Sequence, residues 1–93
     1  MTKDHRYKIA KNLILGGYMK TMNELFDAVP KSVVAKDIGT NLARLNKMMA
    51  DTTLYNFGDV VKIAALLEID ELPVLNLLYH QYQAEKKAKR KKP

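Results

Sequence analysis

The stretch that most constrains the fold of this chain runs from Lys31 to Ala50 and reads KSVVAKDIGTNLARLNKMMA. Its apolar residues recur at helical spacing on both sides of Gly39, which predicts two short helices joined by a sharp turn. Gly39 ends the first helix, because only glycine enters the left-handed C-cap conformation without a steric cost. Asn41 is a good N-cap for the second helix. The stretch therefore predicts two helices that pack closely on each other.

The spacing of a small residue, a glycine and an aliphatic residue indicates how these helices pack. Ala35 lets the helices approach, Gly39 makes the turn, and Leu45 holds the second helix on the first. Over about residues 22–78 the chain resembles the DNA-binding helix-turn-helix of the Cro and lambda-repressor (XRE) family. The residues that carry the resemblance are Val34, Ala35, Ile38, Gly39, Leu45 and Met48.

The resemblance implies a function as well as a fold. It implies a sequence-specific DNA-binding protein of the bacterial or phage type, a regulator of transcription that acts as a repressor. Three positions depart from the family pattern: Thr40 follows the glycine where an aliphatic residue is usual, and Ser32 and Asn41 stand where many members have glutamine. Two other functions remain open, a protein-interaction module on the same scaffold and an RNA-binding factor.

The candidate site is the side of the second helix that lies outside its apolar stripe. Arginine can pair bidentately with guanine and asparagine with adenine, whereas lysine more often contacts phosphate. The alternative is an ordinary amphipathic helix with a solvated polar side. The predicted base-reading residues are Asn41, Leu42, Ala43, Arg44, Asn46 and Lys47, and the predicted phosphate contacts are Lys31, Ser32 and Lys36.

An N-terminal helix is predicted before the family pattern begins. It runs from about His5 to Leu15, with Asp4 as its cap and with Ile9 and Leu13 on its apolar face. Gly16-Gly17 closes it, because two consecutive glycines are costly inside a helix. Residues 1–20 carry a charge of +4, so this helix either lies along a DNA backbone or presents a solvated basic face.

Three further helices are recognised by the residues that begin them. Capping boxes at Thr21–Glu24 and Asn56–Asp59 start two of these helices, and Asp70 caps the last. Their expected core residues include Met22, Leu25, Phe26 and Val29, followed by Val60, Ile63, Ala64 and Leu67. We predict an all-α, five-helix lambda-repressor-like domain over residues 1–84, with a basic and disordered tail at 85–93.

The net charge of +6 is unevenly distributed along the chain. Residues 85–93 contain six Lys/Arg and one Glu and contribute +5, whereas residues 1–84 contribute only +1. Within the domain, residues 31–50 carry +3 and residues 51–71 carry −4. A basic reading unit suits a phosphate-rich partner, and a basic tail either adds affinity for any nucleic acid or only keeps the chain in solution.

The last helix carries more apolar residues than one neighbour can cover. Leu72, Leu75, Leu78, Tyr79 and Tyr82 line one side of it. We expect Leu72 and Leu78 to face inward, and Leu75, Tyr79 and Tyr82 to form the interface of a homodimer. A monomer whose last helix is wholly absorbed by the core is the alternative.

Catalytic and cofactor-dependent functions find little support in the sequence. His5 and His80 are far apart, the chain has no cysteine, and no Gly-rich phosphate loop or metal-ligand spacing is present. We therefore expect no enzyme activity, no cofactor and no metal. No apolar run has the length of a membrane span, and the charges scattered over residues 1–14 differ from a secretion signal. The predicted location is the cytoplasm, in association with the nucleoid.

Overall fold

Between residues 4 and 90 the chain folds into helices joined by short loops, with no strand. The computed structural model describes residues 4–90, and the side chains of residues 4–88. The elements are α1 (Arg6–Leu15), α2 (Met22–Ala28), α3 (Lys31–Ile38), α4 (Leu42–Ala50), the 3-10 helix η1 (Thr52–Leu54), α5 (Phe57–Leu67) and α6 (Glu71–Arg90). The all-α prediction is confirmed for residues 4–90. The described residues form six α-helices, one more than the predicted five, because the count of five leaves out the N-terminal helix that corresponds to α1.

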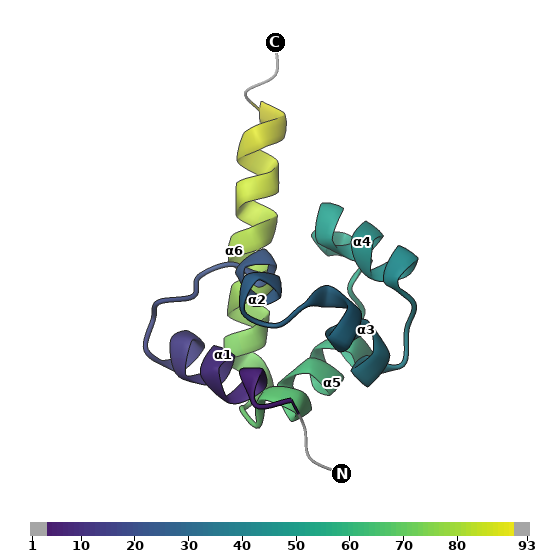
Figure 1. Ribbon diagram of the computed structural model, residues 1–93. Coiled ribbons are helices and arrows are strands. Elements are labelled where there is room, and N and C mark those ends of the chain that lie inside the picture. The colour runs from purple at the N-terminus through teal and green to yellow at the C-terminus, as the bar shows by residue number, and fades with distance from the viewer. Residues whose placement is uncertain (1–3, 91–93) are drawn as a thin grey trace.

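The helices are arranged around the lower half of the long helix α6 (Figure 1). Helices α2 and α5 pack against α6, and α1 packs against α2 and α5. On the other side of the molecule, α3 packs against both α4 and α5. The C-terminal half of α6 rises above the other helices. Among the described helices, none combines the length and the apolar character that a membrane span needs.

The turn between α3 and α4 has the predicted geometry. Gly39 is in the left-handed conformation with φ of 78°, and the N–H of Thr40 donates to the carbonyl of Ala35 at 2.9 Å. The N–H of Arg44 donates to Oδ1 of Asn41 at 2.7 Å, so Asn41 caps α4. Backbone groups that a helix leaves unpaired at its ends are therefore satisfied on both sides of the turn.

The two predicted capping boxes also begin helices. The N–H of Thr21 donates to Oε1 of Glu24 at 2.8 Å at the start of α2. At the start of α5, Asn56 and Asp59 exchange hydrogen bonds of 2.8 and 2.9 Å between each backbone N–H and the other's side chain. Helix α5 ends without a glycine, because Glu68 itself adopts the left-handed conformation with φ of 57°.

The core stripes of α2 and α5 are mostly as predicted, but that of α1 is not. Met22, Leu25 and Val29 are buried, Phe26 is partly buried, and Val60, Ile63, Ala64 and Leu67 are buried.

In α1, Ile9 is exposed, and the buried residues are Tyr7, Ala10 and Ile14. The hydroxyl of Tyr7 donates to Oδ2 of Asp37 at 2.7 Å, which ties α1 to α3. Burial, followed by this hydrogen bond, raises the pKa of Tyr7.

The inward face of α6 also differs from the prediction. Val74, Leu77 and Leu78 are buried, whereas Leu72 is exposed. The expectation that Leu72 faces the core is wrong, because Val74, Leu77 and Leu78 lie at i, i+3 and i+4 and form the stripe that packs inward.

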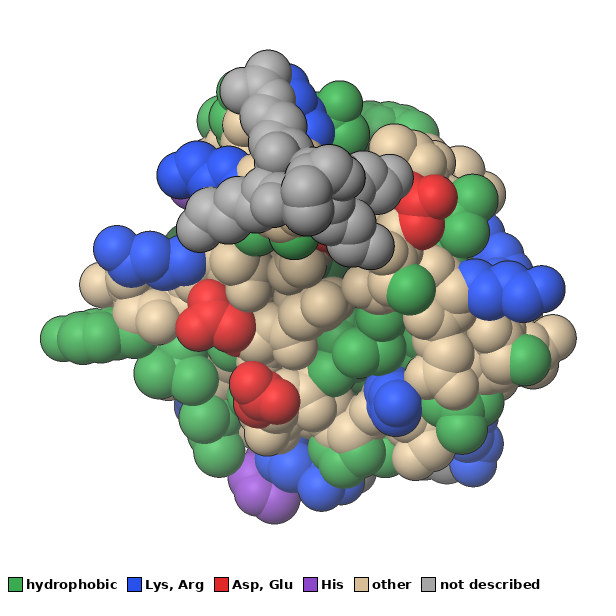
Figure 2. Space-filling view, turned by 90° about the horizontal axis from the view of Figure 1, so that it is seen from above, with side chains coloured by type: hydrophobic (Ala, Val, Ile, Leu, Met, Phe, Trp, Pro, Cys, Tyr) green, Lys and Arg blue, Asp and Glu red, His purple; other side chains and the backbone are tan. Residues whose placement is uncertain are grey.

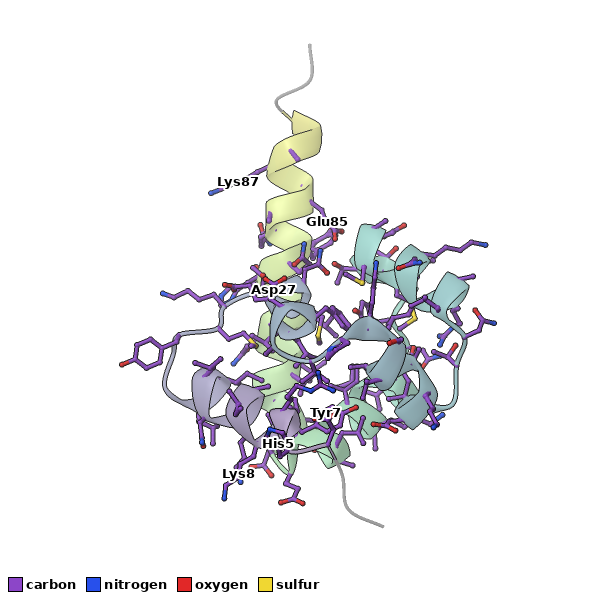
Figure 3. All side chains as sticks on the ribbon, viewed as in Figure 1. His5, Tyr7, Lys8, Asp27, Glu85 and Lys87 are labelled. Carbon is purple, nitrogen blue, oxygen red and sulfur yellow. The ribbon has the colours of Figure 1, made fainter. Side chains whose placement is uncertain are left out.

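Residues 85–90 belong to α6 and are not disordered as predicted. This segment is composed of Glu, Lys, Ala and Arg, all good helix formers, and it contains no helix breaker. Glu85 also anchors the segment, since its carboxylate accepts hydrogen bonds from the N–H of Thr52 at 3.1 Å and from the Thr52 hydroxyl at 2.7 Å. Figure 3 shows Glu85 directed toward the α4 side of the molecule and Lys87 directed away from it. The remainder of the predicted tail, residues 91–93, lies outside the described residues.

Candidate nucleic-acid interface

The predicted base-reading residues lie together on α4 and at its N-terminal end. Asn41, Leu42, Ala43, Asn46 and Lys47 are exposed, and Arg44 is half-buried. Ala43, Asn46, Lys47 and Ala50 recur at i, i+3, i+4 and i+7 and form the outer face of the helix. Leu45 and Met48 are buried behind this face. The helix is thus oriented so that polar and small side chains can meet a partner.

The predicted phosphate contacts are spread along α3. Lys31, Ser32 and Lys36 are all exposed. Lys31 and Ser32 lie in the first turn of α3, and Lys36 lies in its last turn, beside the connection to α4. A rise of about 1.5 Å per residue separates Lys31 and Lys36 by roughly 7.5 Å along the axis. Figure 2 shows Lys and Arg side chains around the outline of the molecule, including a group on the side where Figure 1 places α3 and α4.

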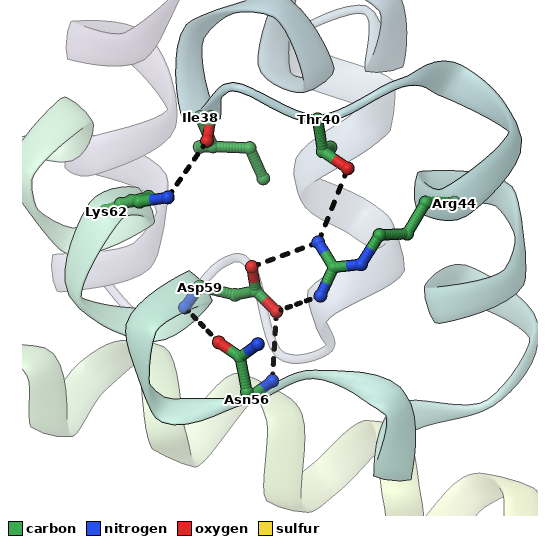
Figure 4. Close-up of polar contacts among 6 residues, drawn as sticks. All are labelled: Ile38, Thr40, Arg44, Asn56, Asp59 and Lys62. Atoms are coloured by element: carbon green, nitrogen blue, oxygen red, sulfur yellow. Dashed lines mark hydrogen bonds and ion pairs between the residues drawn. The ribbon is translucent and has the colours of Figure 1, made fainter.

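Arg44 is directed toward α5, which differs from the outward orientation expected from the sequence. Its Nη2 lies 2.8 Å from Oδ2 of Asp59, and its Nη1 lies 3.2 Å from Oδ1 of the same carboxylate. Nη1 also donates to the hydroxyl of Thr40 at 3.4 Å (Figure 4). Bidentate recognition of guanine uses two guanidinium donors in a fixed fork. In this structure that fork is engaged by Asp59.

Asp59 is the centre of a network that fixes α4 on α5. The residue is 5% exposed, and its carboxylate accepts hydrogen bonds from Arg44 and from the N–H of Asn56. Burial raises the pKa of this carboxyl, but these hydrogen bonds outweigh burial and hold the pKa below its usual value. Lys62 makes a second contact from α5, this one to α3. Its Nζ donates to the carbonyl of Ile38 at 3.3 Å, so that its positive charge complements the C-terminal end of α3 (Figure 4).

Asn41 is also engaged within the protein. Its Oδ1 is the acceptor that caps α4, so its side-chain oxygen is already hydrogen-bonded. Pairing with adenine uses both the oxygen and the nitrogen of an asparagine amide. Asn46 and Lys47, one turn farther along α4, lie on the exposed face instead.

Two contacts that shape this site have no signal in the sequence pattern. Arg44 and Asp59 are fifteen residues apart, and Thr52 and Glu85 are thirty-three apart. Opposite charge makes the first pair possible, but several other pairings are equally compatible with the sequence. The position of α4 relative to α5 must be known before the first pair can be recognised, and that of η1 relative to α6 before the second.

The residues predicted for a dimer interface lie elsewhere, on the outer side of α6. Leu75, Tyr79 and Tyr82 are exposed, and Nζ of Lys86 lies 5.6 Å from the centre of the Tyr82 ring. The structure therefore separates the face of α4 from the apolar face of α6.

Comparison of the chain with protein-family models, with curated proteins and with solved structures found no match.

Proposed function

We propose that this protein binds double-stranded DNA through the α3–α4 pair and regulates transcription, as a repressor. Helix α4 enters the major groove and its outer face reads base edges, while α3 lies against the backbone. The observation that carries the proposal is the orientation of α4. Its polar face is exposed while its position is fixed from behind by the turn at Gly39 and by the Arg44–Asp59 pair.

Each exposed residue of α4 has a role that follows from its chemistry. Asn46 presents an amide that can pair with adenine, and Lys47 presents a cation for guanine or phosphate. Ala43 and Leu42 offer methyl groups to the methyl of thymine. Arg44 positions α4 through Asp59 and does not read a base. This role replaces the one expected from the sequence.

The contacts to the DNA backbone come from α3. Lys31 and Lys36 are exposed cations, and Ser32 presents a hydroxyl in the first turn of the helix. The unpaired amides of a helix N-terminus favour an anion there. These contacts set the register of the protein on the duplex and carry no sequence information themselves.

Selection of bound duplexes from a random library tests the proposal, followed by titration of the selected duplex. Asn46→Ala should weaken binding to the selected duplex by about 5- to 150-fold and leave binding to unrelated duplexes unchanged. Lys47→Ala, if it contacts phosphate, should weaken binding to all duplexes and reduce the salt slope by about 1. Asn12→Ala, in an exposed position of α1, is the matched control for Asn46→Ala, and Lys8→Ala on the same helix shows whether α1 also contacts the DNA backbone. Failure to enrich any sequence, or equal preference in wild type and Asn46→Ala, would contradict base reading by α4.

A protein-interaction module is the second candidate, and one observation favours it. The two side chains best suited to base pairing, Arg44 and Asn41, are engaged within the protein, while Leu42 beside them is exposed. Such a module would retain duplexes only through its basic residues. Its DNA binding would show no preference among sequences and would disappear at high salt.

A further inference from the structure

An apolar stripe runs along the outer side of α6. Leu72, Leu75, Tyr79 and Tyr82 are 64%, 37%, 59% and 38% exposed, respectively. Their spacing of three, four and three residues is the a/d spacing of a coiled-coil seam. The core residues Val74, Leu77 and Leu78 occupy a different side of the same helix. The stripe is therefore a second apolar face of α6 that the described fold does not cover.

Charge is polarised along the same helix. The segment that leads into α6 and its first turn contain the carboxylates of Glu68, Asp70 and Glu71. The C-terminal end contains Lys86 and Lys87, and Lys89 and Arg90 follow in the sequence. A parallel pair of these helices would bring like charges together at both ends. An antiparallel pair brings each acidic end to the partner's basic end, and it also aligns the helix dipoles favourably.

We infer that the stripe of α6 pairs with the same stripe of a second copy of this chain, in an antiparallel arrangement. The register follows from the apolar residues. Leu72 packs against the partner's Tyr82, and Leu75 packs against the partner's Tyr79, so that every large apolar residue of the stripe meets another. This register places Lys86 opposite the partner's Glu68, in the acidic corner that also contains Asp70 and Glu71.

The shape of the molecule permits this arrangement. The stripe lies in the half of α6 that the other helices surround, but its four side chains are exposed, so it faces away from α2 and α5, the helices that pack on α6 (Figure 1). Nζ of Lys86 lies 5.6 Å from the centre of the Tyr82 ring, a cation–π contact that places this side chain beside the end of the stripe. Four large side chains per copy bury less than the roughly 800 Å² per partner of a standard interface, so we expect a dissociation constant on the order of micromolar.

Disulfide trapping tests the register, because the natural chain contains no cysteine. Leu75→Cys and Tyr79→Cys chains, one of them tagged, are oxidised separately and as a mixture. Antiparallel pairing predicts that the mixed disulfide forms about fivefold faster than either self-disulfide, since only that pair brings the Cα atoms within about 7 Å. Tyr18→Cys, a matched exposed tyrosine between α1 and α2, is the control for random collisions.

Sedimentation equilibrium tests the contribution of the charges to the dimer. Protein concentrations of about 1–500 µM bracket the expected dissociation constant. Glu71→Lys and Lys86→Glu should each weaken the dimer roughly fivefold, and their combination should restore it. A monomer throughout this range would overturn the inference. It would also be overturned if the Leu75→Cys and Tyr79→Cys chains cross-linked no faster than the Tyr18→Cys control. Self-disulfides that form as fast as the mixed disulfide would indicate a parallel pair and would overturn it too. None of these measurements uses DNA, so their outcome is independent of the proposed DNA binding.

Discussion

At the scale of single residues, Gly39 carries the strongest conformational requirement at the α3–α4 turn. A Cβ at this position would meet no atom within 4 Å, so the cost of a side chain is backbone strain and not steric overlap. We expect Gly39→Val to lower the free energy of unfolding by about 1–3 kcal/mol, because a β-branched residue is strained at positive φ. Gly39→Asn should lose less, since asparagine tolerates this conformation. Urea denaturation measures both. Unchanged stability of the valine variant would show that the turn does not need a left-handed residue.

Asp59 is the residue whose charge joins α4 to α5. Its pKa in the folded protein lies below the usual value, so the charged form is favoured by folding. This contribution to stability is present above the unfolded pKa of about 3.9 and is lost as the pH falls through the folded pKa. Asp59→Asn should lower the free energy of unfolding at pH 7 by about 1–2 kcal/mol and flatten the loss of stability below about pH 4. Thermal melts across this range check both effects, with Asp27→Asn on the exposed side of α2 as the control. An acid response identical to that of the wild type would show that Asp59 does not contribute it.

At the scale of elements, the ends of the helices could be predicted better than their faces. Ends follow local rules, so the capping box at Thr21–Glu24 and the turn at Gly39 could be identified from a few neighbouring residues. Faces depend on which elements surround a helix. For this reason Ile9 was assigned to the wrong side of α1, and Leu72 to the wrong side of α6. The end of α5 has no such local signal, because Glu68 ends the helix in a left-handed conformation that usually favours glycine.

The link between η1 and α6 is another property of elements, and it rests on Glu85. The buried Thr52 donates two hydrogen bonds to this carboxylate. Glu85→Ala leaves both donors without their acceptor, so we expect the free energy of unfolding to fall by about 1–2 kcal/mol. Lys87→Ala removes a side chain that points away from the body and should have little effect. Hydrogen exchange of the Thr52 amide provides the direct readout. Equal protection in the two variants would contradict the anchoring role.

At the scale of the whole molecule, the position of the candidate site could be predicted from the sequence, but not which of its side chains are available to contact a partner. The periodicity of Leu45 and Met48 correctly separates the buried side of α4 from the side that carries Asn46 and Lys47. Whether a polar residue on that side is available depends on what lies opposite to it. Arg44 is adjacent to Leu45 in the sequence, yet Asp59 of another helix determines its orientation. Such a pairing is a property of the folded molecule and is not encoded in local spacing.

The basic C-terminal end affects the molecule as a whole through its charge. Because Glu85 anchors α6, the informative deletion begins after it and removes residues 86–93. This deletion removes six of the sixteen Lys/Arg and none of the ten Asp/Glu, so the net charge falls from +6 to zero. Counterion release is insensitive to base sequence, so affinity should fall about equally for all duplexes, and the salt dependence should become flatter while base preference is retained. Binding is measured at protein concentrations below the expected micromolar dimer constant, since the deletion also removes Lys86 from the proposed α6 pairing. Loss of base preference with an unchanged salt slope would show that this end of α6 takes part in reading the sequence.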